Sequence, residues 1–154
     1  NKLSLIYAKT GQKKLWTFVD ISSIHRKLDA SLSRALPGFR AFSGCVTTNG
    51  FPGKGKKTFC KEPVTNKRFC DAMRALGETT DISTGPIDKC EEAISSIYGY
   101  KISEVNRVRY EMLIKGAESR DIQSTKDTLV LHTHRANYQT NIWKSSFDKD
   151  SKSK

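Results

Sequence analysis

The stretch best suited to chemistry is residues 44–57, which reads Gly-Cys-Val-Thr-Thr-Asn-Gly-Phe-Pro-Gly-Lys-Gly-Lys-Lys. Four glycines and one proline punctuate it, and three lysines stand at its end. Because glycine has no Cβ, such a turn lets the backbone approach a ligand closely. If Lys56 and Lys57 open a helix, their unpaired N–H groups favour an anion. The pattern predicts a loop that holds phosphate; a surface turn with solvated lysines is the alternative.

The charge of the whole chain favours a polyanionic partner. The 154 residues include 27 Lys and Arg against 16 Asp and Glu, which gives a net charge of +11 and a pI near 9.6. Such a balance attracts nucleic acid over a long range. A membrane surface is the rival partner, but no amphipathic stretch combines a basic face with a broad apolar one, and no run approaches the roughly 18 apolar residues of a membrane span. We predict a nucleic-acid partner, no membrane association, and an intracellular, nuclear location; charge that serves solubility alone is the alternative.

The length indicates a single domain, and the cysteine spacing indicates that its thiols are reduced. The length fits one domain or a piece of a larger protein, and since the chain begins at Asn1 we expect a fragment. The cysteines are never spaced as a Cys-x-x-Cys pair, so we predict reduced, mostly buried thiols rather than disulfides or a zinc site. They are Cys45, Cys60, Cys70 and Cys90. The domain is expected to span 1–147 and to be followed by a disordered basic tail at 148–154.

The first half of the chain predicts a hairpin followed by helices. Apolar runs at Leu3–Tyr7 and Leu15–Val19 are typical of two strands around a turn. Apolar residues then recur at helical spacing from Ile21 to Leu32, with Asp20 or Ser22 as the cap and Pro37-Gly38 as the end. Up to two further helical turns are expected over 39–46.

Helical patterns dominate the remainder. A short helix over 57–61 must end before Pro63, and an apolar face at 69–76 is closed by Gly77. The following helix begins near Pro86 and ends before Gly99; the next is capped by Ser103 and ended by Gly116. A capping box at 124–127 predicts a long last helix that reaches about 143 or 147.

The loop matches neither of two common nucleotide-binding patterns. Gly55-Lys56 is followed by Lys57 where a P-loop needs Ser or Thr, and no strong strand precedes the loop as in a dinucleotide-binding fold. A helix, a glycine-rich turn and a helix instead form a common device for holding a DNA backbone. Backbone N–H groups meet phosphate, and lysines add a salt-dependent attraction.

Two segments resemble a motif of PIN-like nucleases related to the flap endonuclease (XPG) superfamily. Residues 36–48 read Leu-Pro-Gly-Phe-Arg-Ala-Phe-Ser-Gly-Cys-Val-Thr-Thr, and residues 51–57 read Phe-Pro-Gly-Lys-Gly-Lys-Lys. They are most similar to an uncharacterised, mobile-element-associated branch in animals. The segments 105–110, 135–139 and 142–143 share the likeness, which covers most of 14–147.

The resemblance implies a fold and a set of ligands. The expected fold is mainly α with a short β element, the C-terminal part of a PIN-like α/β nuclease with a helix–turn–helix motif that binds the DNA backbone. In such nucleases an acidic residue of the motif binds a catalytic divalent metal, Mg²⁺ or Mn²⁺. The glycine-rich turn often holds K⁺.

The chain departs from that family where the chemistry would take place. Val46 stands where the pattern has Asp, and a hydrocarbon cannot bind Mg²⁺ or Mn²⁺, which need oxygen ligands. The upstream acidic motif is also absent, and Asp20, Asp29 and Asp71 match no ligand pattern. We therefore assign no catalytic and no metal-binding residue, and expect a nuclease-related domain that is catalytically impaired or incomplete.

The other candidate residues have ordinary explanations. His132 and His134 would point about 200° apart on a helix, so a metal site there is disfavoured. His25 is expected to be a solvated helical residue. Tyr110, Tyr138 and Trp143 are suited to stacking on bases, but at helical spacing they are more often part of a core.

The sequence thus predicts binding to the backbone of duplex DNA by the glycine-rich loop. The predicted binding residues are Gly53, Lys54, Gly55, Lys56, Lys57 and Lys61, with Lys67 and Arg68 extending the track. One alternative is an interaction module of a mobile-element-derived protein that meets RNA or an acidic protein. Another is a working metal-dependent endonuclease completed by carboxylates upstream of Asn1.

Overall fold

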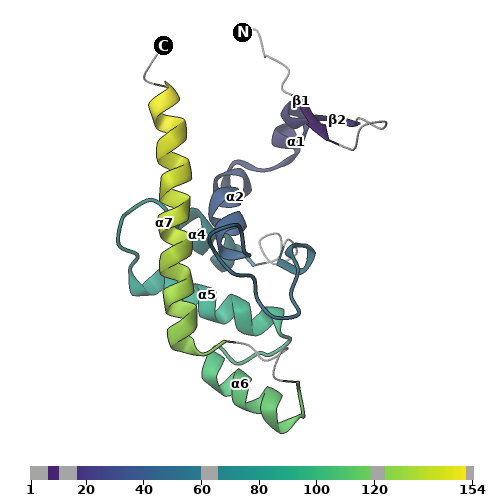
Figure 1. Cartoon of the computed structure of the whole chain (residues 1–154), viewed down its shortest axis with the longest axis vertical. Helices are drawn as coiled ribbons and strands as arrows, with labels where there is room; N and C mark the ends of the chain where they lie inside the picture. The colour runs from purple at the N-terminus through teal and green to yellow at the C-terminus, as the bar shows by residue number, and fades with distance from the viewer. Residues whose placement is uncertain (1–6, 11–16, 60–65, 119–123, 152–154) are drawn as a thin grey trace.

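A computed structural model describes residues 7–10, 17–59, 66–118 and 124–151, and Figure 1 shows the arrangement of their elements. The prediction of a mainly helical protein with a short β element is confirmed. The elements are β1 (Tyr7–Thr10), β2 (Thr17–Asp20), α1 (Ile21–Lys27), α2 (Ala30–Phe42), α4 (Lys67–Ala75), α5 (Thr84–Ile97), α6 (Val105–Ile114) and α7 (Lys126–Ser151). Residues 56–59 are helical as well.

The two strands form an antiparallel ladder in which Tyr7 pairs with Asp20 and Thr10 with Thr17. Of the predicted strand residues, Tyr7 and 17–19 lie in this ladder, and β1 continues to Thr10; residues 3–6 and 15–16 and the predicted turn lie outside the described residues. With α1 the ladder forms a unit at one end of the molecule, away from the helical body (Figure 1). Within the described residues the ladder is a two-stranded antiparallel sheet, not the parallel sheet of an α/β fold.

The helix predicted from Ile21 to Leu32 is two helices, each of which begins after an aspartate. Asp20 Oδ1 accepts a hydrogen bond from Ser23 N at 2.9 Å and begins α1, which ends at Lys27. Asp29 Oδ1 accepts from Leu32 N at 2.8 Å and begins α2. Each carboxylate satisfies an N–H that the first turn leaves unpaired, so the two acids have structural roles.

The predicted break at Pro37-Gly38 is wrong, because α2 continues through both residues to Phe42. Proline removes one helical hydrogen bond and strains the preceding turn. The compensation is close packing on α4: a Cβ at Gly38 would overlap the carbonyl group of Met73 and lie 3.1 Å from Leu76 Cβ. Burial of a long apolar helix against α4 and α7 thus outweighs the local cost of Pro37.

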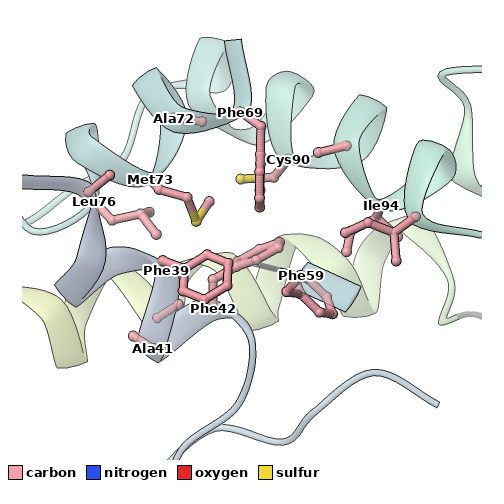
Figure 2. Packing of buried hydrophobic residues seen from close by; sticks show 14 of the residues in the cluster. Phe39, Ala41, Phe42, Phe59, Phe69, Ala72, Met73, Leu76, Cys90 and Ile94 are labelled. Carbon is pink, nitrogen blue, oxygen red and sulfur yellow. The ribbon is translucent and has the colours of Figure 1, made fainter. Parts of the chain in front are cut away.

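The core lies where α2, α4, α5 and α7 meet, and Figure 2 shows its aromatic and sulfur-containing centre. Phe42 is fully buried, and its ring centroid lies 5.3 Å from that of Phe51, 6.3 Å from that of Phe59 and 6.0 Å from that of Phe69. The predicted apolar faces of α4 and α5 are confirmed. Their buried members are Phe69, Ala72, Met73, Ile87, Cys90, Ile94 and Ile97.

The C-terminal helices begin and end slightly differently from the sequence patterns. Glu104, not Ser103, occupies the cap position of α6, and Thr125 rather than Ser124 receives the Thr128 N–H at the start of α7. The last helix continues to Ser151. The backbone of 148–151 is therefore helical where the sequence predicted a disordered tail, and 152–154 lie outside the described residues.

A buried amide joins α7 to the end of α4. Asn137 Oδ1 accepts from Gly77 N at 2.7 Å, and its Nδ2 donates to the carbonyls of Thr79 and Thr80 at 3.0 Å each. Gly77 has a φ of +76°, and a Cβ there would lie 2.7 Å from Asn141 N. The predicted glycine stop after α4 is thus confirmed, and α7 packs directly against it.

Candidate nucleic-acid interface

The loop 51–59 is anchored in the core at both of its ends. Phe51 and Phe59 are only 7% and 0% exposed, and their ring centroids lie 5.2 Å apart. Each fully buried aromatic side chain stabilises the fold by roughly 1.5–3 kcal/mol. Both contact Phe42, which fixes the loop to the end of α2. What lies between the two anchors is a short segment of proline, glycine, lysine and threonine that is held in place.

A tight turn follows the first anchor. Lys54 N donates to Phe51 O at 3.1 Å, and Gly53 has a φ of +62°. Proline in the second position and a glycine with positive φ in the third are typical of a type II turn. Gly53 is exposed, so its backbone faces solvent at the tip of the turn.

The second glycine of the loop begins the helical segment. Gly55 O accepts from Thr58 N at 3.0 Å and from Phe59 N at 3.3 Å. The N–H groups of Lys56 and Lys57 precede these first helical bonds, so the helix supplies them with no acceptor. A Cβ at Gly55 would meet no atom within 4 Å, and its φ is not positive. The position therefore leaves open space for a ligand beside the backbone.

The three lysines of the loop have different surroundings. The half-buried Lys54 holds its ammonium 4.9 Å from the ring centroid of Tyr98. Lys56 donates to Gly44 O and joins the two ends of the glycine-rich stretch. Lys57 is exposed and has no partner among the described residues. Of the three lysines, Lys57 is thus the one whose side chain makes no hydrogen bond, ion pair or ring contact within the described residues. Lys56 has a structural contact that the sequence did not predict.

The remaining predicted track is only partly described. Lys61 lies outside the described residues. Lys67 and Arg68 are exposed at the start of α4, and Arg68 pairs with Glu92 at 3.1 Å. The sequence from Ala30 to Lys61 contains no carboxylate at all. The surface formed by the loop and the end of α2 therefore has a local excess of positive charge.

The first half of the glycine-rich stretch is an ordered turn whose tip carries Val46. Cys45 N donates to Thr48 O at 2.9 Å, and Thr48 Oγ1 donates to Ala41 O at 2.6 Å. Thr47 Oγ1 reaches Gln139 of α7 at 2.7 Å. The side chain of Val46 is fully exposed at 102%. The side chain of Val46 therefore packs against no part of the described core.

The side chains of the described residues do not fit a catalytic divalent metal. Within the described ranges, no three His, Cys, Asp or Glu side chains come together as a metal site. Asp20 and Asp29 cap helices, and Asp71 pairs with Arg74 at 3.4 Å. Because Mg²⁺ and Mn²⁺ depend on several oxygen ligands, we assign no metal step to these side chains.

The turn is also a poor site for the potassium ion that the resemblance implies. The carbonyls of Gly44, Phe51, Pro52 and Gly55 already accept hydrogen bonds. One of these donors is the ammonium of Lys56, a cation in its own right. A further monovalent cation among these oxygens would meet that charge at short range.

The cysteines differ in environment. Cys70 and Cys90 are buried free thiols, as predicted, and Cys60 lies outside the described residues. Cys45 is half-buried instead. Burial raises the pKa of its thiol, but hydrogen bonds with Thr47 and Thr48 outweigh that effect and lower the pKa to about 7.

Two of the three aromatic candidates differ from the expectation of a core role, and Trp143 agrees with it. Tyr110 and Tyr138 are 63% and 67% exposed, whereas Trp143 is partly buried against the core. His132 and His134 lie on α7, the first buried and the second exposed, so they cannot share a metal. His25 is an exposed helical residue, as predicted.

His132 completes the aromatic cluster beneath the loop. Its Nε2 lies 2.7 Å from Phe42 O, and its ring centroid lies 4.8 Å from that of Phe51. Burial lowers the pKa of His132 below its ordinary 6.5; the hydrogen bond to Phe42 acts in the opposite direction, and Arg135 lowers the pKa further. The neutral imidazole therefore belongs to the folded state, and it donates its Nε2 proton to Phe42 O.

We predict that the free energy of unfolding falls as the pH drops below 6.5. A group whose pKa is lower in the folded state adds stability above its unfolded pKa, and this stability is lost as the pH falls through the folded value. Urea unfolding at pH 7.5 and pH 5.0 measures the effect. His132→Gln should flatten this dependence, while the exposed control His134→Gln should retain it. Equal pH slopes for the wild type and His132→Gln would contradict the assignment.

Comparisons with protein-family models, curated proteins and solved structures give no significant match to this chain. Among the described helices, none has the length and apolar character that crossing a membrane requires.

Proposed function

We propose that this chain is a nucleic-acid-binding domain that holds the phosphate backbone of duplex DNA with the loop 51–59. One observation carries the proposal. Phe51 and Phe59 fix both ends of the loop in the core, and the segment between them exposes the glycine backbone and Lys57. A fixed loop binds an anion without a large ordering cost, and exposed N–H groups with a nearby ammonium suit phosphate oxygens.

The contacts favour the backbone over the bases. Gly53, Gly55 and the start of the helical segment offer main-chain donors, which carry no information on base sequence. The loop presents no Asn, Gln or Arg that could read a base edge. Binding of this kind depends on charge and on the spacing of phosphates rather than on sequence.

The likeness to PIN-like nucleases agrees with this proposal. In that interpretation α2, the glycine-rich turn and the helical residues 56–59 act as the backbone-binding helix–turn–helix of a nuclease-related domain. With Val46 exposed and no carboxylate cluster in the described part, we propose binding without cleavage for the chain as it stands. A nuclear location is the corresponding expectation.

A second candidate, a protein-interaction module, is favoured by one feature of α6. Tyr110, Leu113 and Ile114 are 63%, 50% and 67% exposed and occupy one side of that helix, at i, i+3 and i+4. Exposed apolar groups that cluster in this way are typical of protein contacts. A chain that binds no DNA at low salt would favour this candidate.

We predict that the affinity for duplex DNA depends strongly on salt and weakly on sequence. The logarithm of the affinity should fall linearly with the logarithm of the salt concentration, with a slope of about −3 if roughly three phosphates are neutralised. Fluorescence anisotropy with two duplexes of unrelated sequence measures both quantities. A slope near zero, or no binding at about 50 mM salt, would reject the proposal.

A further inference from the structure

A surface pocket of about 440 Å³ lies beside the loop, where the ends of α5 and α6 meet the turn at 52–54. This volume is within the roughly 300–1,000 Å³ typical of sites for small ligands. The lining residues are Pro52, Gly53, Lys54, Tyr98, Tyr100, Met112, Lys115, Gly116 and Ala117. The lining therefore combines two tyrosines and two lysines and contains no acidic residue.

The aromatic and basic residues are arranged in pairs. Lys54 Nζ lies 4.9 Å from the ring centroid of Tyr98, and Lys115 Nζ lies 4.8 Å from that of Tyr100. A cation over an aromatic face is attracted by the ring quadrupole. Both tyrosines are only half-buried, so they retain surface that a ligand can contact. Each pair presents an aromatic surface and a positive charge next to each other.

One contact between distant segments and one local helix-end bond build the pocket in advance. Tyr98 Oη donates to Pro52 O at 2.8 Å and joins the end of α5 to the turn. Ala117 N donates to Met112 O at 3.0 Å and closes the end of α6, where Gly116 has a φ of +77°. The walls are thus fixed by hydrogen bonds of the fold itself.

The electrostatics favour an anion in this pocket. Its lining contains no carboxylate. Lys115 also lies 3.9 Å from the carboxylate of Glu111, an exposed pair that is weakly coupled. Lys54 has no carboxylate partner among the described residues. An anionic group that enters therefore meets two ammonium groups in a lining that also includes the apolar side chains of Pro52, Met112 and Ala117.

We propose that this pocket holds one nucleoside monophosphate unit, either a free nucleotide or an unpaired nucleotide of a strand. The phosphate pairs with the ammonium that lies over a tyrosine ring, and the base stacks on the surface of a tyrosine that remains exposed. The inference rests on the proposed function in one respect: the turn at 52–54 belongs both to the DNA-binding loop and to the pocket. A backbone held by the loop therefore continues to the entrance of the pocket.

The test compares three ligands: a blunt duplex, the same duplex with three unpaired thymidines at its 5′ or 3′ end, and dTMP. We expect one overhang to increase affinity about tenfold over the blunt duplex, in line with stacking of a base on an aromatic residue. Tyr100→Ala and Lys115→Ala should remove this gain and leave binding of the blunt duplex within about twofold. Tyr100→Phe, which keeps the ring, should retain it.

Lys101→Ala is the matched control, since it removes the same charge from an exposed residue that does not line the pocket. Binding of an overhang or of dTMP that is lost in Tyr100→Ala and kept in Lys101→Ala supports the pocket; dTMP binding alone identifies a free nucleotide as the ligand. The inference is overturned if the overhang adds no affinity and dTMP does not bind. It is also overturned if Lys101→Ala lowers the affinity for these ligands as much as Tyr100→Ala does. Absence of blunt-duplex binding rejects the proposed function separately, because dTMP still tests the pocket.

Discussion

Gly38→Ala is expected to destabilise the protein by about 3 kcal/mol, although alanine favours a helix more than glycine does. In an exposed helix the same change stabilises by about 0.5–1 kcal/mol. Here the new methyl would overlap the carbonyl group of Met73, which is main chain and cannot rotate away. The helices α2 and α4 would have to separate, and the aromatic core between them would lose contact.

Urea or thermal unfolding of the purified chain measures this change. Gly85→Ala is the matched control, because Gly85 lies in the first turn of α5 and a Cβ there meets no atom within 4 Å. We expect Gly85→Ala to change the stability by less than about 1 kcal/mol, because the helix preference of alanine is opposed by its position before Pro86. If Gly38→Ala were equally neutral, α2 and α4 would not pack as closely as described.

Lys57→Glu is expected to weaken binding to duplex DNA about tenfold at low salt and to reduce the magnitude of the salt slope by about one. Lys57 is exposed next to unpaired backbone N–H groups, so reversing its charge places a carboxylate against phosphate. Lys56→Glu is a less clean test, because Lys56 also holds Gly44 O. A change at Lys56 alters the shape of the loop together with its charge.

Lys27→Glu on α1 provides the same change of charge at an exposed residue outside the loop. We expect it to reduce affinity by less than about threefold, since separated surface charges are screened over about 10 Å at 0.1 M salt. Gly55→Ala adds a test of the backbone contact, because its Cβ meets no protein atom and can obstruct only a ligand. Equal losses for Lys57→Glu and Lys27→Glu would show that total charge, not the loop, drives binding.

Local patterns were sufficient for much of the helical structure. The apolar faces of α4 and α5 follow from spacing that repeats with the helix, and the glycine after α4 closes it as predicted. Asp20 as a cap and the turn at Pro52-Gly53 depend on neighbours a few residues away. Such features are encoded within one or two helical turns, so the sequence alone determines them.

Tertiary packing decided three features that sequence patterns predicted wrongly or did not reveal: the continuity of α2, the anchoring of the loop and the pocket beside it. Helix α2 continues through Pro37 because Gly38 allows α4 to approach, a fact set by residues more than thirty positions away. The glycines and lysines of the loop were visible in the sequence, but the anchoring by Phe51 and Phe59 was not. Sequence spacing does not reveal which distant side chains share a core, since burial is a property of the assembled helices. The same reason explains why the pocket of Tyr98 and Tyr100 emerged only from the structure: its three walls come from segments separated along the chain.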